Sequence, residues 1–384
     1  MKIRKILISI MLLIVMFVLV GCGDKNGNDN NKSDIKDLND GKTRIALLIN
    51  GNLGDMSFFD SAKAGMDKFA KDYPDVEVKV VEMGTDSSRW EPTLRQTAND
   101  SFDLIIVGTT QMAEPLQRLV KMSRYSDRRF IIFDTEIEDN KAANYPTVHS
   151  ILFKQNEGGY IAGALSALIT HQKGKTNTGF IGGMKIDIIN DFGYGFMQGV
   201  QRVNKDKGTN IKAFNGYVGD FYNSPKGKSL ANTMYTHGNV EILFAAASQA
   251  GLGALDEAKN LNKLIIGVDS DQYDFFKDTD HAKANQIVTS ILKRVDLALY
   301  EACEKFLEGT LEYGVLKYLG INEGKIGFVK NVNYEDKVSE DIRLYIDQLY
   351  EEVKADSSTV KSGLKRFTSS DELNALYDLM DPNK

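Results

Sequence analysis

Short apolar runs alternate with longer amphipathic stretches through most of this sequence. The first run, Arg44–Ile49, ends at the turn residues Asn50 and Gly51, and the amphipathic stretch 58–70 follows it. Short apolar runs of this length predict strands that are buried on both faces, and the stretches between them predict helices that cover those faces. The alternation therefore predicts an α/β fold with parallel, doubly wound sheets.

The predicted strands fall into two successive sets, with no break in composition between them. The first set ends near residue 133, and the same pattern restarts with a helix predicted over 157–170. Two sets of one type predict two similar doubly wound lobes. The apolar runs are 44–49, 76–81, 104–107 and 130–133 in the first set, and 179–183, 211–214, 241–245 and 264–268 in the second.

A further apolar run, 286–292, is interpreted as a strand that returns to the first lobe. The first lobe then comprises residues 43–152 and 287–328, and the second comprises 153–286 and 329–384. Three strands would cross between the lobes and form a hinge, which can bend without unfolding either lobe. The crossings are expected near residues 153, 287–290 and 328–333.

The N-terminal residues 1–21 have the pattern of a secretion signal. A basic head precedes fifteen uncharged residues, Ile6–Val20, a run shorter than the roughly 20 apolar residues of a membrane span. The run ends in Leu19-Val-Gly-Cys22, which resembles the lipobox of bacterial lipoproteins and implies that Cys22 is acylated. The alternatives are an ordinary signal peptide with a chance cysteine, or an uncleaved anchor. Residues 22–42 are polar and are expected to form a flexible tether.

The charge and the cysteine content exclude several classes of protein. Loss of the three cations in the signal takes the formal net charge from −6 to −9, which argues against a nucleic-acid binder. Only Cys22 and Cys303 occur, so a disulfide scaffold and a thiolate zinc site are excluded. The sequence has no phosphate loop, no serine-nucleophile elbow and no pair of histidines spaced to hold a metal from one helix. We therefore expect no cofactor, no metal and no enzyme activity.

Acidic and aromatic residues follow several of the predicted strands. In open α/β sheets the ligand crevice lies at the carboxyl ends of the strands, so these residues are candidates for a binding site. Alternatively, an aspartate after a strand can be a helix cap or a turn residue, and a phenylalanine can belong to the core. Carboxylates suit a vicinal diol, and phenylalanine suits a flat ring. The candidates are Asp55, Ser57, Phe58, Phe59, Asp134, Phe192 and Asp269.

Six short segments, taken in order, resemble the basic membrane protein family of solute-binding lipoproteins, which includes purine nucleoside receptors. The resemblance covers residues 43 to about 332. It implies a periplasmic-binding-protein-like clamp that feeds an ABC importer, often with a nucleoside as cargo. The segments are Gly54-Asp55-x-Ser57-Phe58, Asn156-Glu157-Gly-Gly-Tyr160-Ile-Ala-Gly163, Phe180-Ile-Gly-Gly-Met184, Phe192-x-x-Gly195-Phe196-x-x-Gly199, Gly267-Val268-Asp269-x-Asp271-Gln272 and Thr289-Ser290-x-x-Lys293-x-x-Asp296.

The resemblance also implies roles for individual residues. Asp269 would accept hydrogen bonds from the ribose hydroxyls, and Lys293 would donate to the sugar or the base. Asp134 would read an edge of the base. Phe58 would cover one face of the base, and Phe192 would close the other face.

Two positions depart from the family pattern. The family has an asparagine after Ser-Phe where this chain has Phe59, and it usually has glycine where this chain has Ser248. Both changes leave the clamp intact and bear on the identity of the cargo.

These features predict a monomeric, lipid-anchored binding protein on the extracytoplasmic face of the cell membrane, attached through Cys22. Its expected partners are a nucleoside, with a purine favoured, and the membrane permease of an ABC importer. Because the ligand contacts both lobes only when they are closed, binding shifts the population towards the closed form. The sequence leaves open a ligand-sensing regulatory lipoprotein with the same clamp, a sugar-binding importer component and a nucleoside hydrolase.

Overall fold

The structure is a computed structural model that describes residues 41–364, 369, 371 and 374–375. All of these residues fall in one compact unit of the chain. The predicted signal at 1–21, the predicted acylation site Cys22 and nearly all of the predicted tether lie outside the described residues.

The first sheet contains six strands, all paired in parallel, in the order β11-β5-β4-β3-β1-β2. Its inner strands are short, mainly apolar and buried along nearly their whole length, as expected for a sheet covered on both faces. The edge strand β2 instead alternates exposed and half-buried residues. The strands are β1 (Arg44–Ile49), β2 (Glu77–Glu82), β3 (Leu104–Gly108), β4 (Arg129–Phe133), β5 (Val148–Phe153) and β11 (Val315–Leu319).

The second sheet repeats this arrangement in the order β12-β10-β9-β8-β6-β7. All of its pairs are parallel except β12, which runs antiparallel to β10. The strands are β6 (Asn177–Gly182), β7 (Lys212–Tyr217), β8 (Ile242–Ala246), β9 (Leu264–Asp269), β10 (Ile287–Lys293) and β12 (Ile326–Phe328).

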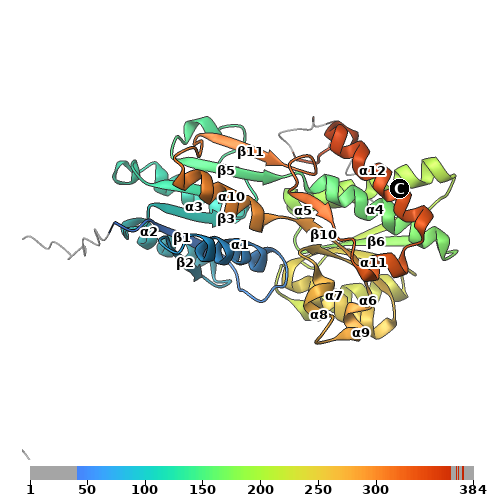
Figure 1. The fold of residues 1–384 in the computed structure, drawn as a ribbon. Coiled ribbons are helices and arrows are strands. Elements are labelled where there is room, and N and C mark those ends of the chain that lie inside the picture. The colour runs from blue at the N-terminus through green and yellow to red at the C-terminus, as the bar shows by residue number, and fades with distance from the viewer. Residues whose placement is uncertain (1–40, 365–368, 370, 372–373, 376–384) are drawn as a thin grey trace, which may run out of the picture. The chain divides into compact units, whose positions relative to one another are not determined.

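Helices cover both faces of each sheet (Figure 1). In β1, Ile45 and Leu47 pack with α1 on one face, whereas Ala46 and Leu48 pack with α2 and α3 on the other. This alternation follows from the two-residue repeat of a strand. The helices are α1 (Phe58–Asp72), α2 (Trp90–Asn99), α3 (Thr110–Val120), α4 (Gln155–Gln172), α5 (Asp187–Lys207), α6 (Ser224–Thr236), α7 (Ser248–Leu261), α8 (Gln272–Phe276), α9 (His281–Ala284), α10 (Val295–Leu307), α11 (Val332–Lys337) and α12 (Glu340–Ala355), with short 3₁₀ turns at Ser87–Arg89, Ser123–Tyr125, Ala142–Asn144 and Ser357–Thr359.

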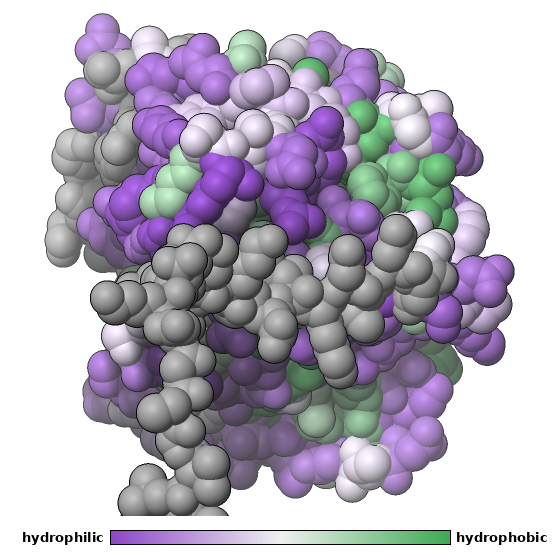
Figure 2. All heavy atoms as spheres, turned by 90° about the vertical axis from the view of Figure 1, so that its left-hand side faces the viewer, coloured by the Kyte–Doolittle hydropathy of each residue, from purple (hydrophilic) through white to green (hydrophobic). Residues whose placement is uncertain are grey.

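We call the first sheet with α1–α3 and α10 the first lobe, and the second sheet with the remaining α-helices the second lobe. The predicted α/β fold of two similar lobes is confirmed. On the face shown in Figure 2, hydrophilic residues predominate and apolar side chains gather only in small groups.

The assignment of residues 286–292 to the first lobe is wrong. Strand β10 pairs in parallel with β9, so it belongs to the second sheet, and the chain crosses to the first lobe only after Lys293. The third crossing also comes earlier than 328–333, because β12 already lies in the second sheet from Ile326. An uncharged run predicts burial in a parallel sheet but carries no information about which sheet it joins.

Three short crossings connect the lobes and bond to one another. Lys154 in the first crossing donates its backbone N–H to the carbonyl oxygen of Leu319 at 2.8 Å, and Arg294 in the second donates to that of Lys325 at 2.9 Å. The buried carboxylate of Glu157 accepts the N–H of Ile321 in the third crossing at 2.7 Å. The crossings therefore form one hinge.

Within the part of the chain that the structure describes, no helix has the length and apolar character needed to cross a membrane.

Candidate ligand-binding cleft

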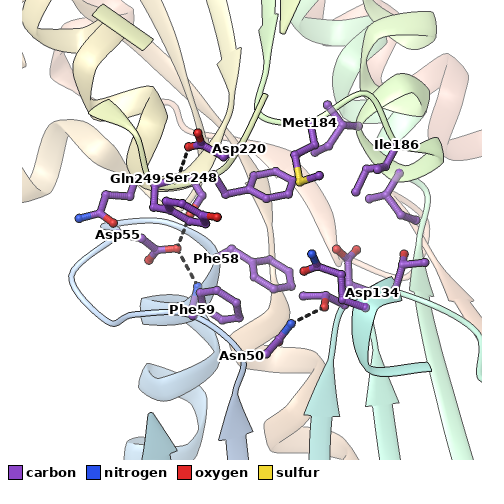
Figure 3. Close-up of a pocket in the computed structure, with 18 of the residues that line it drawn as sticks. Asn50, Asp55, Phe58, Phe59, Asp134, Met184, Ile186, Asp220, Ser248 and Gln249 are labelled. Carbon is purple, nitrogen blue, oxygen red and sulfur yellow. Dashed lines mark hydrogen bonds between the residues drawn. The ribbon is translucent and has the colours of Figure 1, made fainter. Parts of the chain in front are cut away.

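A cavity of about 270 Å³ lies between the lobes, at the carboxyl ends of strands from both sheets. It is close in size to the lower end of the roughly 300–1,000 Å³ range of small-molecule sites. Residues at or after the ends of β1, β2, β3 and β4 line it from the first lobe, and residues at or after the ends of β6, β7, β8, β9 and β10 line it from the second. Figure 3 shows Asn50, Phe58 and Asp134 facing the cavity from one side, and Met184, Ile186 and Asp220 facing it from the other.

Asp269 ends strand β9 and lies on the wall of the cavity, 7% exposed. Its carboxylate accepts a hydrogen bond from the hydroxyl of Ser57, which belongs to the loop after β1 in the other lobe. Burial raises the pKa of Asp269 to about 7, although the positive charge of Lys293 and the Ser57 hydroxyl both oppose the shift. Asp269 and Ser57, which were each predicted as site residues, therefore meet across the cleft.

Lys293 ends strand β10, and its ammonium group forms an ion pair with Asp134, the residue after β4 in the first lobe. The Lys293 side chain is only 3% exposed. Its Nζ lies 5.1 Å from the ring centre of Phe58 and 5.7 Å from that of Phe192, within cation–π range. Burial raises the pKa of Asp134, and the charge of Lys293 opposes this rise. A cation and two carboxylates thus converge from opposite lobes.

Two aromatic side chains on the cavity wall come from different lobes. Phe58 begins helix α1 and packs edge-on against Phe59, with ring centres 5.2 Å apart. Phe192 lies on α5 and packs edge-on against Phe244 at 5.8 Å. Phe196, one turn further along α5, stacks on Phe244 and belongs to the core rather than to the cavity wall.

Asp55 lines the cavity, but hydrogen-bond donors of the protein itself already use the acceptor positions of its carboxylate. It accepts backbone N–H groups from Ser57 at 3.1 Å, Phe59 at 3.0 Å and Asp60 at 3.1 Å, so it caps the start of α1. It also accepts the hydroxyl of Ser248 in the second lobe at 2.8 Å (Figure 3). A carboxylate has about four acceptor positions, and four donors reach this one. Direct ligand binding by Asp55 would require one of these bonds to break.

Asn50 was not among the candidates from sequence, where it was interpreted as a turn residue. It follows β1, is 5% exposed and donates its amide to the hydroxyl of Thr109 at 2.8 Å. Among the residues that the structure describes, its buried Oδ1 has no hydrogen-bond partner. A buried polar atom without a partner is costly unless another molecule supplies one. The position directly after a buried strand was the signal that could have identified it.

The apolar wall of the cavity was also missed. Helix α5 begins at Asp187, and its first turn places Ile188 and Ile189 beside Phe192. From the sequence alone, apolar residues at the start of a helix cannot be distinguished from residues of the hydrophobic core. Their position becomes informative only when the two lobes are placed together.

Several residues with a strained backbone conformation lie at the cleft. Thr109, Asp134, Ser248 and Asp269 line the cavity with positive φ values of 70°, 61°, 49° and 67°. Away from the cavity, the described non-glycine residues with positive φ are three asparagines, which tolerate this conformation, and Met56 of the loop after β1. Strain of this kind clusters at binding sites, and here four strand ends share it.

The residues of the cavity favour binding rather than reaction. Carboxylates offer acceptors to hydroxyl groups, a buried lysine offers a donor, and aromatic and aliphatic side chains offer apolar contact. Within the described residues, no three His, Cys, Asp or Glu side chains are grouped so as to hold a metal ion. Two hinged α/β lobes with such a cleft between them define a solute-binding protein of the periplasmic type.

The chain belongs to the family described as ABC transporter substrate-binding protein PnrA-like, whose profile matches residues 42–359. This result confirms the predicted resemblance to the basic membrane proteins. By this description, members of the family are the substrate-binding components of ABC transporters.

Individual relatives agree with this assignment. Basic membrane protein A of Borreliella afzelii is 30% identical over 298 residues, covering 77% of this chain and 85% of that protein. The CD4+ T-cell-stimulating antigen of Listeria innocua is 29% identical over 373 residues, covering 92% of this chain and 97% of that protein. A solved ABC transporter solute-binding protein of Aeropyrum pernix K1 superposes with a TM-score of 0.66 at 25% identity, covering 88% of this chain and 90% of the other.

Proposed function

We propose that this protein binds a nucleoside, with a purine favoured, and delivers it to the permease of an ABC importer. The observation that carries the proposal is the cluster of Asp269, Lys293 and Asp134 beside Phe58 and Phe192 in a cavity of the right order of size. Carboxylates and a lysine suit the hydroxyls of a ribose, and rings from opposite lobes suit a flat base between them.

Asn50 and Asp134 supply the contacts proposed for the base edge. Both follow strands of the first lobe, and both are buried at the cavity wall. The amide oxygen of Asn50 has no partner among the described residues, so it can accept an N–H from a base. Asp134 can accept a second N–H if it keeps its ion pair with Lys293. Two acceptors at this end of the cavity favour a base that presents two N–H donors.

The charge of the cavity wall disfavours phosphorylated ligands. Among the described residues that line the cavity, Lys293 is the only cation, whereas Asp55, Asp134, Asp220 and Asp269 are acidic. A nucleotide would bring two or more negative charges into this environment, and like charges at close range oppose binding. We therefore propose a nucleoside as the cargo rather than a nucleotide.

The proposal extends to the location and assembly of the protein. Acylation of Cys22 would anchor it on the extracytoplasmic face of the cell membrane, and the polar residues 22–42 would act as the tether. It would act as a monomer, because one cavity between two lobes of one chain forms a complete site. Ligand-driven closure of the lobes would produce the form that the permease recognises.

Titration calorimetry against a panel of small molecules tests the cargo. The panel contains adenosine, guanosine, inosine, cytidine, uridine, free ribose, free adenine and adenosine monophosphate. We expect purine nucleosides to bind most tightly and the nucleotide to bind at least tenfold more weakly than its nucleoside. Ribose that binds as tightly as adenosine would overturn the base-stacking role and indicate a sugar importer. Absence of binding by every nucleoside would overturn the proposal.

A further inference from the structure

The segment Val360–Leu364 follows the last 3₁₀ turn and lies beyond the part of the chain that matches the family profile, which ends at residue 359. It lies along helix α5 of the second lobe. The backbone of Lys361 exchanges two hydrogen bonds with the side chain of Gln198, one as donor and one as acceptor, each of 2.9 Å. Pairing in both directions specifies the register of the segment on the helix.

Asp191 of α5 provides a second, buried anchor for the segment. Its Oδ1 accepts the backbone N–H of Gly363 at 2.6 Å and the hydroxyl of Ser362 at 2.9 Å. Its Oδ2 accepts the side-chain amide of Gln155, at the start of α4, at 2.7 Å. A fully buried carboxylate is costly unless its acceptor positions are used, and the segment supplies two of the donors here.

Close packing holds the same segment against α5. A methyl group added at Gly363 would overlap the ring of Tyr194, so the backbone lies directly on this ring. Asn156 of α4 donates its amide to the carbonyl oxygen of Val360 at 3.0 Å. The segment is therefore docked on the second lobe through both of the helices that support the wall of the cleft.

The end of the segment reaches the other lobe. Leu364 is buried and packs with Ile188 of α5, Leu152 of β5 and the partly buried Leu316 and Tyr318 of β11. Ile188 also lines the ligand cavity, whereas β5 and β11 are neighbours in the first sheet. Leu364 thus fills an apolar junction between the lobes, on residues adjacent to the cleft.

We propose that residues 360–364 form an interlobe strap that favours the closed arrangement of the clamp and thereby raises ligand affinity. If the second lobe moves away from the first, Leu364 must leave either Ile188 or the strands β5 and β11, and its apolar side chain then loses part of its burial. The proposed role of the strap depends on closure of the lobes around a ligand, but it does not depend on which ligand is bound.

Distances between spin labels on the two lobes test the strap directly. The labels are placed on cysteines introduced at two exposed positions, Glu114→Cys on α3 and Lys205→Cys on α5. Cys22→Ser is included throughout, and Cys303 is buried. Leu364→Ser removes the apolar contact, and Gly363→Ala displaces the segment from Tyr194. We expect both variants to lengthen the distance distribution of the ligand-free protein.

The matched control is Leu344→Ser, which changes a leucine of α12 that is 63% exposed. It should leave the distance distribution unchanged. Adenosine affinity should fall about threefold or more in the strap variants, because a smaller closed fraction weakens apparent binding in proportion. If the wild-type protein does not bind adenosine, this result would count against the proposed cargo. The distances measured in the ligand-free protein would still test the strap.

Two results would overturn the strap. The first is an unchanged distance distribution in both strap variants, even with a lower melting temperature, since that would make the segment a packing element of one lobe. The second is a shift of equal size in Leu344→Ser, since that would be a general effect of altering the C-terminal region. If Leu364→Ser fails to fold, Gly363→Ala provides the same comparison with the leucine retained.

Discussion

Asp269 has a backbone conformation that a non-glycine residue rarely adopts, with φ at +67°, and it is buried beside a second aspartate and a lysine. Each of these features has a cost in the free protein. Burial opposes the charged carboxylate, and the left-handed backbone costs of order 1–3 kcal/mol. The residue with these free-energy costs lies at the wall of the cavity. Asp269 is therefore a strong candidate for ligand binding.

The substitution Asp269→Ala tests this role. If the carboxylate accepts both hydroxyls of a ribose, its loss should weaken binding of a purine ribonucleoside at least tenfold, in line with the ~1–3 kcal/mol for a buried hydrogen bond left unmade. The 2′-deoxy analogue should bind the wild type more weakly than the ribonucleoside, and the variant should scarcely distinguish the two. Calorimetry measures all four affinities. Wild-type affinity in the variant would leave Asp269 as a turn residue.

A second buried carboxyl makes the stability of the protein depend on pH. Burial raises the pKa of Asp191 from 3.8 to about 7, so the folded protein keeps this proton over a range in which the unfolded chain has released it. The folded state binds more protons between pH 4 and pH 7, so this contribution to stability is fully present below about pH 4 and is lost as the pH rises through 7.

Asp191→Asn removes the titration while retaining the shape of the side chain. Gln155 can turn its amide to accept from the new group, because its Oε1 has no partner among the described residues. We expect the wild type to lose ~1–2 kcal/mol more unfolding free energy than the variant between pH 5.5 and pH 7.5. Urea unfolding at the two pH values measures this difference. Equal losses in both proteins would show that Asp191 does not titrate in this range.

At the scale of elements, helices α4 and α5 approach closely enough for their backbones to touch. A methyl group at Gly159 or Gly163 of α4 would overlap a carbonyl oxygen of α5, and one at Gly195 or Gly199 would overlap a carbonyl oxygen of α4. Close contact between the two helix backbones therefore explains why both family segments, around Tyr160 and Phe196, contain glycines. They place α5, and with it Phe192, at the wall of the cleft.

Gly163→Ala should destabilise the protein, because the new methyl group meets the backbone carbonyl of Phe196 and cannot be relieved by a change of rotamer. We expect a loss of ~1–3 kcal/mol or more in unfolding free energy. The matched control is Gly251→Ala in α7, where the nearest atom to the new methyl would be 3.7 Å away. That change should be neutral or stabilising by up to ~1 kcal/mol. Equal effects of the two substitutions would contradict the close packing of α4 and α5.

At the scale of the whole molecule, one buried ion pair joins the two lobes. Lys293 belongs to the second sheet and Asp134 to the first, and the Lys293 charge also acts on Asp269. Around the same cavity, Ser57 bonds to Asp269 and Ser248 bonds to Asp55. The structure is therefore in a closed arrangement, held by bonds between side chains of opposite lobes.

Lys293→Met tests this connection by removing the charge and keeping the apolar stem. The change leaves two buried aspartates without a cation, so we expect a loss of ~3–5 kcal/mol in unfolding free energy. Adding Asp134→Asn should recover part of the loss. The control Lys330→Met breaks a half-exposed pair with Asp347 and should cost less than ~1 kcal/mol. Urea unfolding provides each value, and a loss in Lys293→Met no larger than in the control would contradict the role of the pair.

Much of the fold and part of the candidate site follow from local sequence. The alternation of apolar runs and amphipathic stretches predicted two parallel sheets, because strand and helix periods are properties of a few neighbouring residues. Asp134 and Asp269 were predicted at the carboxyl edges of strands for the same reason, since each directly follows an apolar run. Asp55 was predicted as a ligand residue, but the structure shows a cap and an interlobe partner. Nothing near it in the sequence identifies Ser248.

The sequence alone thus determined the fold class, most of the strands and the strand ends that carry polar residues, since these depend on contacts between near neighbours. Strands β5, β11 and β12 were not predicted. The tertiary structure alone decided which sheet accepts β10, where the lobes cross, and that residues 360–364 dock on α5 and reach β5. It also brought Ser57 to Asp269 from 212 residues away. Such pairings depend on the shapes of two packed surfaces, and a short apolar run or a single serine is compatible with many partners before those surfaces exist.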